Sequence, residues 1–290
     1  MISRDFSQHM YVNKYEIIAK IGSGMFGSVY KGSHKKTGKM VAIKCETIDS
    51  PIKILKNESH ILKYLYDHGC RSIPLVHWYG IHNDFTCLIM PYYDCTLTQY
   101  LNNETFTREK LDKIFVNLIG MFENIHTNMV IHRDVKPDNF MIKNGNIYLI
   151  DFGFSMFYIQ EDGYHIENEI SDILTGTPKY ISYNIHCGDM PSRRDDLISL
   201  GYVYLYMLMK ELPWDILPEL IQNDNYETNH IEYYRNQSIR QYKKIEHIET
   251  LKPIIGEEIT LFFGYCYYIR YEAHPEYNAL KDIFLQKCFK

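Results

Sequence analysis

The stretch IHRDVKPDNF, residues 131–140, places charged and polar side chains between apolar ones. Ile131, Val135 and Phe140 favour burial, whereas most of the residues between them favour water. This alternation indicates a loop that is held against a core, and loops on rigid scaffolds carry much of protein chemistry. We therefore expect a functional loop here, and the remaining motifs must indicate which function it serves.

The loop contains the pattern H-R-D-x-K-x-x-N, which fixes five letters in eight positions and rarely arises by chance. Asp134 can accept the proton of a hydroxyl group and direct its oxygen at a γ-phosphate, and Lys136 can neutralise charge on the transferring phosphoryl group. Asn139 can ligate Mg²⁺. For residues 137–138 turn chemistry is the simpler interpretation, and we expect His132 to pack the loop against the core.

A glycine-rich motif, IGSGMFGSV, precedes this loop by about a hundred residues. Glycines let the backbone approach phosphates and present N–H groups to them. A Rossmann fold would need a helix after the glycines and an acid about twenty residues on. Glu46 fits the second condition, but the residues after the glycines alternate as a strand, which argues against that fold. A purely structural turn remains the alternative. The candidate nucleotide-binding residues of this motif are Ile21, Gly22, Ser23, Gly24, Met25, Phe26, Gly27, Ser28 and Val29.

Two further motifs supply charged groups suited to a nucleotide. VAIK ends at Lys44, a cation that can pair with α- and β-phosphates, and Glu58 on the next predicted helix can hold it in place. A solvated strand lysine is the plain alternative, but the distance from the glycine motif favours function. DFG follows a predicted strand, and the carboxylate of Asp151 suits Mg²⁺.

The hydrophobic periodicity changes along the chain. Residues 15–47 alternate as strands, Ser50-Pro51 should begin a helix that stops at Gly69, and two more strand-like stretches follow. The later part begins with an amphipathic helix capped by Thr107. It continues with a hairpin at Asn144-Gly145, a buried helix over 197–209 and a short helix near 277–288. Strands followed by helices predict an α+β architecture of two lobes with a cleft near residue 92.

Composition restricts the class of protein. The 290 residues are 46% hydrophobic and 23% charged, as in ordinary globular proteins. A net charge of −5 provides no basic field, so nucleic acid is not an expected partner. No apolar run approaches the roughly 20 residues that cross a bilayer, and MISRDFSQHM has no signal-peptide character. The seven cysteines are scattered without a C-x-x-C pair. They predict reduced thiols in a soluble intracellular protein, in the cytoplasm or nucleus.

Together these motifs resemble the eukaryotic protein kinase family, from about residue 15 to residue 289. The resemblance implies a loose leader over 1–14 and a bilobal α+β kinase domain over 15–290. Its small β-rich N-lobe with one main helix would span 15–91, and its larger, mainly helical C-lobe would span 92–290. It implies ATP, Mg²⁺ held by Asn139 and Asp151, and transfer of a phosphoryl group to a protein hydroxyl.

The resemblance also assigns individual residues. Met90 would close the back of the adenine pocket, Tyr93 would offer backbone groups to adenine, and Ala42 would lie against the ring together with Val29. Thr177 matches the family threonine that braces the catalytic loop, and Asp196 matches the aspartate that holds the backbone of that loop. Lys136, two positions after Asp134, is the pattern of serine/threonine kinases.

Within the family, Ser182-Tyr183-Asn184 and SRRDDLISLGY resemble the casein kinase 1 superfamily, and LKDIFLQ resembles the vaccinia-related kinases as much. The high tyrosine content, 26 residues, would suit a large DNA virus or an AT-rich protist; a viral kinase could act in the host cell or the virion. This branch implies a basic site for acidic or phosphorylated substrates. The candidates are Lys179, Arg240 and Lys243, although the acidic residues of 161–172 oppose such a preference through like-charge repulsion.

Three further expectations concern regulation and alternatives. The acidic residues of 161–172 would pair with Arg133, so that phosphorylation of this segment is not needed. The segment 215–250 would be a surface excursion with one or two helices, serving as a spacer or a docking surface. We expect a monomer that acts on protein serine or threonine, without nucleic-acid or membrane partners.

The alternatives to this function are a pseudokinase and a small-molecule phosphotransferase. The presence of Lys44, Asp134, Asn139 and Asp151 argues against the first, and GTPKY and SRRDDL argue against the second.

Overall fold

The computed structural model describes residues 6, 10–24, 27–171, 174–215 and 236–285. The chain divides into two compact units. The N-terminal unit comprises Met1–Leu97 and Phe140–Ser155, and the C-terminal unit comprises Thr98–Asn139 and Met156–Lys290. A β-sheet region followed by a helical region confirms the α+β prediction.

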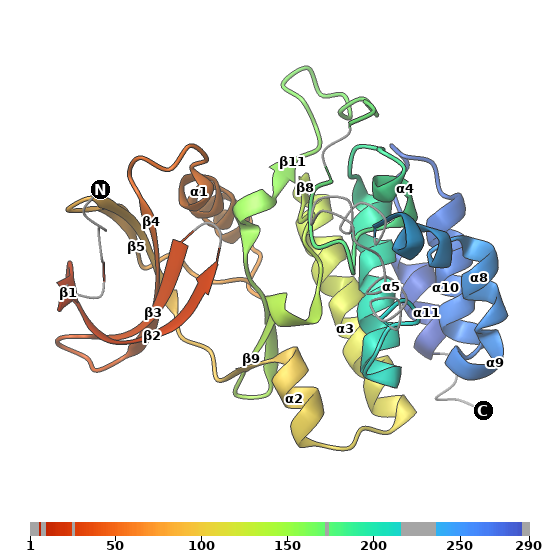
Figure 1. Ribbon diagram of the computed structural model, residues 1–290, viewed down its shortest axis with the longest axis horizontal. Helices are drawn as coiled ribbons and strands as arrows, with labels where there is room; N and C mark the ends of the chain where they lie inside the picture. Colours follow the sequence, from red (N-terminus) through yellow and green to blue (C-terminus); the bar gives the residue numbers. More distant parts are fainter. Residues whose placement is uncertain (1–5, 7–9, 25–26, 172–173, 216–235, 286–290) are drawn as a thin grey trace, which may run out of the picture. The chain divides into compact units, whose positions relative to one another are not determined.

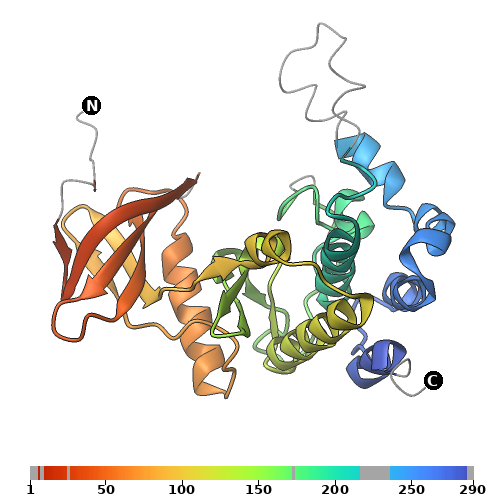
Figure 2. The same cartoon turned by 90° about the horizontal axis from the view of Figure 1, so that it is seen from below.

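A six-stranded antiparallel sheet forms most of the N-terminal unit, with the strand order β1-β2-β3-β4-β6-β5 (Figure 1). Figure 2 shows this sheet strongly curved, with helix α1 beside it. The elements are β1 Tyr11–Val12, β2 Tyr15–Gly24, β3 Gly27–His34, β4 Met40–Thr47, α1 Ile54–Asp67, β5 Trp78–His82 and β6 Phe85–Pro91. The strands predicted over 15–47 and the two strand-like stretches predicted after the helix are therefore present.

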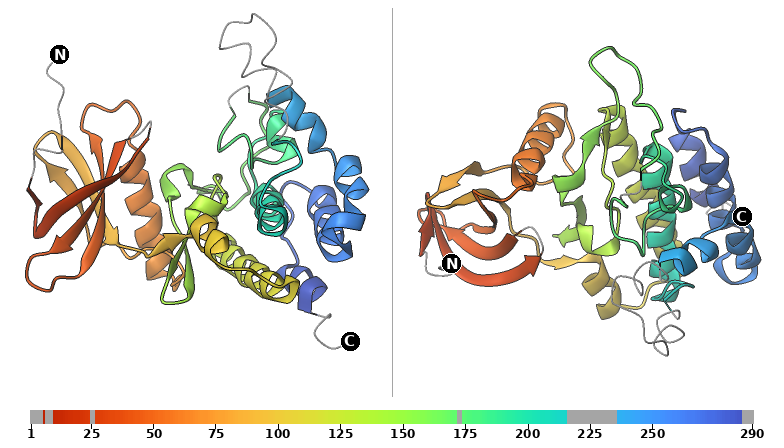
Figure 3. Two further views of the ribbon diagram at one scale, coloured as in Figure 1. Left: turned by 60° about the horizontal axis from the view of Figure 1, so that its bottom comes forward. Right: turned by 45° about the horizontal axis from the view of Figure 1, so that its top comes forward.

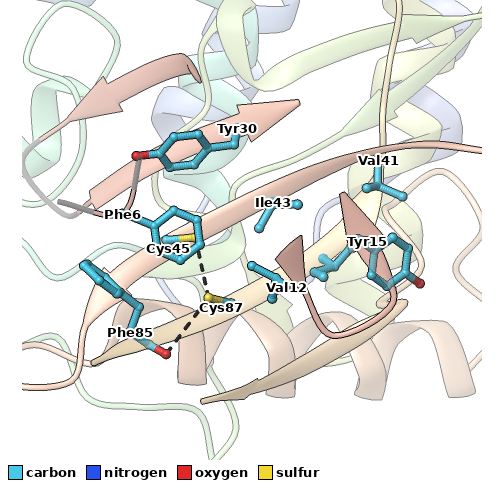
Figure 4. Packing of buried hydrophobic residues seen from close by; sticks show 10 residues of the cluster. Phe6, Val12, Tyr15, Tyr30, Val41, Ile43, Cys45, Phe85 and Cys87 are labelled. Atoms are coloured by element: carbon cyan, nitrogen blue, oxygen red, sulfur yellow. Dashed lines mark hydrogen bonds between the residues drawn. The ribbon is translucent and has the colours of Figure 1, made fainter. Parts of the chain in front are cut away.

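One face of the sheet carries a compact aromatic and aliphatic core (Figure 4). The ring of Phe6 lies 4.9 Å from those of Tyr30 and Phe85, and Val12 is completely buried. The prediction of a loose leader is therefore wrong for Phe6 and Tyr11–Val12, because apolar side chains here complete the core and β1 pairs with β2. The cross-strand partners Cys45 and Cys87 have their sulfur atoms 3.5 Å apart, and both are free thiols.

Helix α1 buries the side chains of Ile54, Ile61, Leu62 and Leu65, which lie on one face of the helix. It begins at Ile54 rather than at the predicted cap, because the Ser50 hydroxyl donates to the carbonyl of Ile52 in a turn. The side chain of Glu46 on β4 takes over the capping role and accepts the Leu55 N–H at 3.2 Å. The start of α1 is thus fixed by a contact with the sheet, which stabilises unpaired N–H groups of its first turn.

A small second sheet completes the N-terminal unit, with the order β10-β9-β7. Its strands are β7 Cys95–Thr96, β9 Phe140–Lys143 and β10 Asn146–Leu149, and the short 3₁₀ helix η3, Phe152–Phe154, follows. Asn144 and Gly145 have φ values of 51° and 76°. The predicted Asn-Gly hairpin is confirmed, since both central residues of such a turn need positive φ.

The C-terminal unit is mainly helical (Figure 3). Its elements are α2 Leu97–Asn103, α3 Arg108–Thr127, β8 Val130–Ile131, η2 Pro137–Asn139, β11 Met156–Phe157, α4 Tyr183–His186, α5 Arg193–Met209, α8 Ile245–Thr250, α9 Lys252–Ile255, α10 Glu257–Tyr268 and α11 Tyr277–Leu285. Helix α5 packs against α3 and α10, and α11 packs against α3. The two short strands β8 and β11 pair with each other beside α3.

Buried aromatic residues join the central helices. The ring of Phe115 on α3 lies 4.6 Å from that of Tyr204, 5.0 Å from that of Phe262 and 4.9 Å from that of Phe284. Helix α5 is buried on nearly all sides, as its sequence predicts. Thr107 caps α3 by accepting the Lys110 N–H at 3.3 Å, which confirms the predicted cap. In the described ranges, no helix has both the length and the apolar character needed to cross a membrane.

Of the predicted excursion over 215–250, residues 215 and 236–250 are described, and 216–235 lie outside the described residues. Residues 236–242 and α8 are helical, as expected. However, Ile239, Lys243 and Ile248 are buried, so this part belongs to the packed unit and is not a solvated spacer.

Candidate active site

Lys44 on β4 is held by two carboxylates of the N-terminal unit. Its Nζ donates to both oxygens of Glu58, at 2.7 and 2.9 Å, and to Oδ1 of Asp151 at 2.9 Å. Burial alone would lower the pKa of Lys44, but the negative charges of Glu58 and Asp151 raise it above its ordinary value. The ammonium group therefore stays charged and fixed in direction.

Glu58 reaches Lys44 from α1 and is completely buried. Burial raises the pKa of Glu58, and the nearby cation of Lys44 acts in the opposite direction. A buried carboxylate of this kind depends on its cation. Lys44 and Glu58 thus tie the position of α1 to strand β4.

The segment Asp151–Gly153 is held by α1. Asp151 has φ 69° and ψ 62°, a left-handed conformation that is unfavourable for a residue other than glycine. A Cβ atom on Gly153 would clash with the side chain of Ile54. The amide of Asn57 donates to the carbonyls of Gly153 and Ser155, both at 2.9 Å. Sequence reasoning missed Asn57, which has no motif of its own.

A pocket opens between the glycine motif and Asp151 in this unit, and its empty space, including the solvent at its mouth, is about 570 Å³. Its lining consists of Gly24, Gly27, Ser28, Val29, Lys44, Cys45, Ile54, Leu55, Glu58, Asp151 and Phe154. Gly27 has φ 147°, and a Cβ atom there would clash with the carbonyl oxygen of Cys45. Glycine is therefore required at this position. Met25 and Phe26, also predicted to bind nucleotide, lie outside the described residues.

Six other predicted nucleotide residues are described but do not line this pocket: Ile21, Gly22, Ser23, Ala42, Met90 and Tyr93. The buried Met90 packs with Leu55, which does line it, and Ala42 on β4 pairs with Met90 on β6. The structure thus places Met90 and Ala42 in one hydrophobic cluster with a residue of the pocket lining.

The segment after β6 is fixed by the second sheet. The ring of Tyr93 is buried 4.9 Å from that of Tyr148, and the Lys143 ammonium donates to the carbonyl of Tyr92 at 2.7 Å. The Asp94 N–H donates to the carbonyl of Ile142 at 2.9 Å. These contacts give residues 92–94 a defined backbone, as a segment that offers hydrogen bonds to a ligand requires.

Asp134 is the centre of a hydrogen-bond network in the C-terminal unit. Its Oδ1 accepts the Thr177 hydroxyl at 2.7 Å and the Thr177 N–H at 3.1 Å. Its Oδ2 accepts the Lys136 ammonium at 2.7 Å and the Asn139 amide at 3.1 Å. Lys136 also donates to the Thr177 hydroxyl at 3.0 Å. The structure therefore brings together Asp134, Lys136, Asn139 and Thr177, as the motif predicts.

Asp196 on α5 holds the backbone before Asp134. It accepts the N–H groups of His132 and Arg133 at 2.7 and 2.9 Å, the contact expected from the sequence. Burial would raise the pKa of Asp196, but the hydrogen bonds that it accepts, chiefly the one from His126, lower it below its usual range. His126 in turn lies 2.7 Å from the hydroxyl of Tyr277, so α11 supports the loop through α3. His126 and Tyr277 were not predicted from the sequence.

His132 plays the expected structural part. Its side chain is completely buried, and its Nδ1 accepts the N–H of Asp134 at 3.3 Å. The imidazole thus fixes the backbone of the loop from the core side.

The two predicted Mg²⁺ ligands belong to different units, Asn139 to the C-terminal and Asp151 to the N-terminal one. The Asn139 amide nitrogen donates to Asp134, to its carbonyl at 2.7 Å and to Oδ2, so the amide oxygen is directed away from that residue. The carboxylate side chain of Asp151 is 40% exposed. Both side chains carry an oxygen atom that can bind a metal ion, and oxygen atoms are the ligands that Mg²⁺ prefers. The two residue types therefore fit this ion.

The hypothesis that acidic residues of 161–172 pair with Arg133 is wrong for the described residues of this segment. The guanidinium of Arg133 donates to the Thr175 hydroxyl at 3.1 Å and lies 3.3 Å from the sulfur of Met156. The Arg133 Nε is buried without a hydrogen-bond partner in the described structure. No ion pair joins Arg133 to a carboxylate of 161–171, and Asp172 lies outside the described residues.

The predicted basic substrate site is not an open cluster of cations. Lys179 forms an ion pair with Asp215 at 2.7 Å, which neutralises its charge locally. Lys243 is completely buried, so its assignment to an exposed anion site is wrong. Arg240 is partly exposed. The sequence could not show that Lys243 turns inward, because a lysine is usually an exposed residue.

The residues Ser182 and Asn184 share one buried partner. The Ser182 hydroxyl donates to Oδ1 of Asp195 at 2.6 Å, and the Asn184 amide donates to the same atom at 3.1 Å. The Asp195 Oδ2 accepts the N–H and the hydroxyl of Ser192 at 2.9 and 3.1 Å. The two separate sequence motifs, SYN and SRRDDL, are therefore one physical unit that joins α4 to the start of α5.

A family model described as the protein kinase domain matches residues 15–287. The match covers nearly the whole chain, and the chain therefore belongs to the protein kinase family. Membership supports a phosphotransferase whose substrates are proteins, and protein kinase domains generally use ATP and Mg²⁺.

Proposed function

We propose that this chain is an active serine/threonine protein kinase of the casein kinase 1 type. The observation that carries the proposal is the network in which Asp134 accepts hydrogen bonds from Lys136, Asn139 and Thr177. A pseudokinase has no need of a carboxylate and an ammonium held 2.7 Å apart in the catalytic loop. Such preorganised charges are what phosphoryl transfer requires.

In the proposed reaction the carboxylate of Asp134 orients the acceptor hydroxyl and takes its proton. Lys136 lies close enough to place positive charge near the same oxygen and near the transferred phosphoryl group. Thr177 fixes the carboxylate plane through two hydrogen bonds. These contacts limit the directions that Asp134 can adopt, which favours attack in a single geometry.

Lys44 is proposed to bind the α- and β-phosphates of ATP, with Glu58 keeping its ammonium in place. Asn139 and Asp151 would hold Mg²⁺, which neutralises phosphate charge when bound. The glycine motif lies beside Lys44 in the same pocket, where its backbone can approach phosphates. Met90 and Ala42 would define the apolar end of the site that receives adenine.

The finer assignment to serine/threonine specificity and to casein kinase 1 rests on sequence patterns with a physical basis. Lys136 stands in the serine/threonine position of the loop. Ser182 and Asn184 replace the acidic ending of most kinase activation segments, and both bind Asp195. The paired charges of Lys179 and Asp215 do not support a preference for phosphorylated substrates. We propose that the kinase acts as a monomer on unprimed protein sites.

The direct test is phosphate transfer by the full chain from radiolabelled ATP with Mg²⁺ to casein and to peptide libraries with Ser, Thr or Tyr acceptors. Asp134→Asn should lower transfer by roughly 10²-fold to 10⁴-fold, because it removes the proton acceptor. ATP affinity, measured by calorimetry, should stay within about twofold, since this residue binds no nucleotide in the proposal. The exposed Asp67→Asn on α1 is the matched control.

The outcomes separate the candidate functions. Wild-type turnover by Asp134→Asn would overturn the role of this residue, and transfer to tyrosine alone would overturn the predicted specificity. ATP binding by wild-type protein without transfer to any acceptor, including itself, would favour the pseudokinase.

A further inference from the structure

One lysine of the C-terminal unit is buried, and no described residue provides a carboxylate partner for it. Lys243 follows the helical residues 236–242 and has no exposed surface. In the described structure no Asp or Glu lies within ion-pair distance of its ammonium, so its hydrogen bonds must offset the cost of burial. Its Nζ donates to the carbonyls of Ile181 at 2.6 Å and Pro178 at 2.8 Å.

The surroundings of Lys243 are suited to a cation. The rings of Tyr202 and Trp214 each lie 5.0 Å from its Nζ, within the range of a cation–π contact. The Nε2 of His186 lies 3.3 Å away. The Tyr267 hydroxyl donates to the Lys243 carbonyl at 2.6 Å and fixes its backbone. Burial lowers the pKa of Lys243. Hydrogen bonds to carbonyls and contacts with ring faces act in the opposite direction, because they favour a cation.

The two carbonyls that bind Lys243 belong to a tight turn over 177–181. Within it, the carbonyl of Thr177 accepts the N–H groups of Tyr180 and Ile181 at 2.8 and 3.0 Å. Lys243 contacts the turn near its start and at its end. Trp214, which also flanks the ammonium, donates its ring N–H to the Lys179 carbonyl at 2.9 Å. The turn is thus fastened to one buried group at several points.

This turn begins at the residue that fixes the proposed catalytic base. Thr177 gives both its N–H and its hydroxyl to Oδ1 of Asp134. Lys243 is therefore separated from Asp134 by a single turn of backbone, although the two residues are more than a hundred positions apart in the sequence. A displacement of that turn would move Thr177 away from the carboxylate.

We propose that Lys243 is a positioning residue for phosphoryl transfer: its buried ammonium holds the 177–181 turn, and through Thr177 the turn holds Asp134. The inference rests on the proposed function, since it assigns Asp134 to the reaction. It also gives the segment 236–250 a part in activity, in addition to its packing.

A residue that only fills the core would affect stability and leave kinetics of the folded protein unchanged. The test therefore uses Lys243→Met, which keeps the unbranched shape and removes the donors. The adjacent, partly exposed Lys244→Met is the matched control, because among the described residues its ammonium forms neither a hydrogen bond nor an ion pair. Circular dichroism identifies a temperature at which each variant is folded, and urea unfolding measures its stability at that temperature.

At that temperature Lys243→Met should lower kcat for the best peptide by roughly 10-fold to 100-fold, as a small misplacement of reacting groups does. KM for ATP should stay within about twofold, since Lys44 and the glycine motif are unchanged. Lys244→Met should match the wild type. In addition, Thr177→Val with Lys243→Met should be no slower than Thr177→Val alone, because both changes remove the same support.

A second variant covers the case in which Lys243→Met does not fold. Lys243→Arg keeps the charge and the ring contacts but moves the donors, and it should show an intermediate kcat that couples to Thr177→Val. A folded Lys243→Met with wild-type kcat, or full additivity of Lys243→Arg with Thr177→Val, would overturn the inference. An inactive wild-type protein would instead count against the proposed function.

Discussion

Lys44 and Asp134 show two ways of holding a reactive charge. Lys44 is one cation between two carboxylates, whereas Asp134 is one carboxylate with a single cation and three neutral donor groups. In both cases the side chain has a fixed direction before any substrate arrives. Fixed charges need little rearrangement during a reaction, which is a main source of rate enhancement in enzymes.

Replacing Lys44 with methionine should affect activity and stability through different neighbours. Activity should fall by at least about 100-fold, because no group of this side chain could then orient the phosphates. Stability should fall by about 3 kcal/mol, since the fully buried Glu58 loses its cation. Both are measured on one preparation, by peptide phosphorylation and by urea unfolding.

The control for this prediction is the double variant Lys44→Met with Glu58→Gln. Removing the buried charge should restore part of the lost stability while activity stays absent. A double variant as unstable as Lys44→Met alone would show that the buried charge is not the cause.

The sequence identified the residues that act on substrate better than those that hold them. Asp134, Lys136, Lys44 and Asp151 stand in dense motifs, where spacing alone carries information. Asn57, in contrast, is a single polar residue on a helix, and its partners are 96 and 98 positions away in the chain. Its role depends on tertiary contacts, for which a local pattern has no signature.

At the level of helices and strands, periodicity predicted long elements well and short ones poorly. Helices α3 and α5 have enough turns for an apolar pattern and a cap to be read. Strands β7, β8 and β11 contain two residues each, too few for alternation to show. The start of α1 was misplaced because its capping group, Glu46, comes from a neighbouring strand.

The packing of α5 against α10 depends on a glycine. A Cβ atom on Gly201 would lie 2.5 Å from Cε1 of Phe263, inside van der Waals contact. Gly201→Ala should therefore lower the free energy of unfolding by roughly 1–3 kcal/mol through overpacking. Urea unfolding followed by far-UV circular dichroism measures this change.

The matched control lies on the partner helix. Around Gly264 of α10 nothing lies within 4 Å of an added Cβ, apart from the helix's own backbone. Gly264→Ala should therefore be neutral or stabilise by up to about 1 kcal/mol, as alanine favours helices. Equal effects of the two alanines would contradict the proposed close approach of α5 and α10.

For the molecule as a whole, titratable groups buried in the C-terminal unit should set the response to acid. Burial lowers the pKa of His126, His165 and His186, and that of His186 falls to about 3. The positive charge of Lys243 adds to this effect at His186. These imidazoles remain neutral in the folded protein at pH values where an unfolded chain would protonate them.

Stability should therefore fall as the pH drops from 7.5 to 5.5. The unfolded chain binds a proton at His186 below its ordinary pKa of about 6.5, and the folded protein does not until about pH 3. At pH 5.5 this difference favours unfolding by about 1.4 kcal/mol from His186 alone. Urea titrations at both pH values give the free energy of unfolding. Between pH 7.5 and 5.5 this free energy should fall less in His186→Gln than in the wild type, and the difference should be about this amount. The same loss in the variant and the wild type would mean that His186 binds its proton as readily in the folded protein as in the unfolded chain.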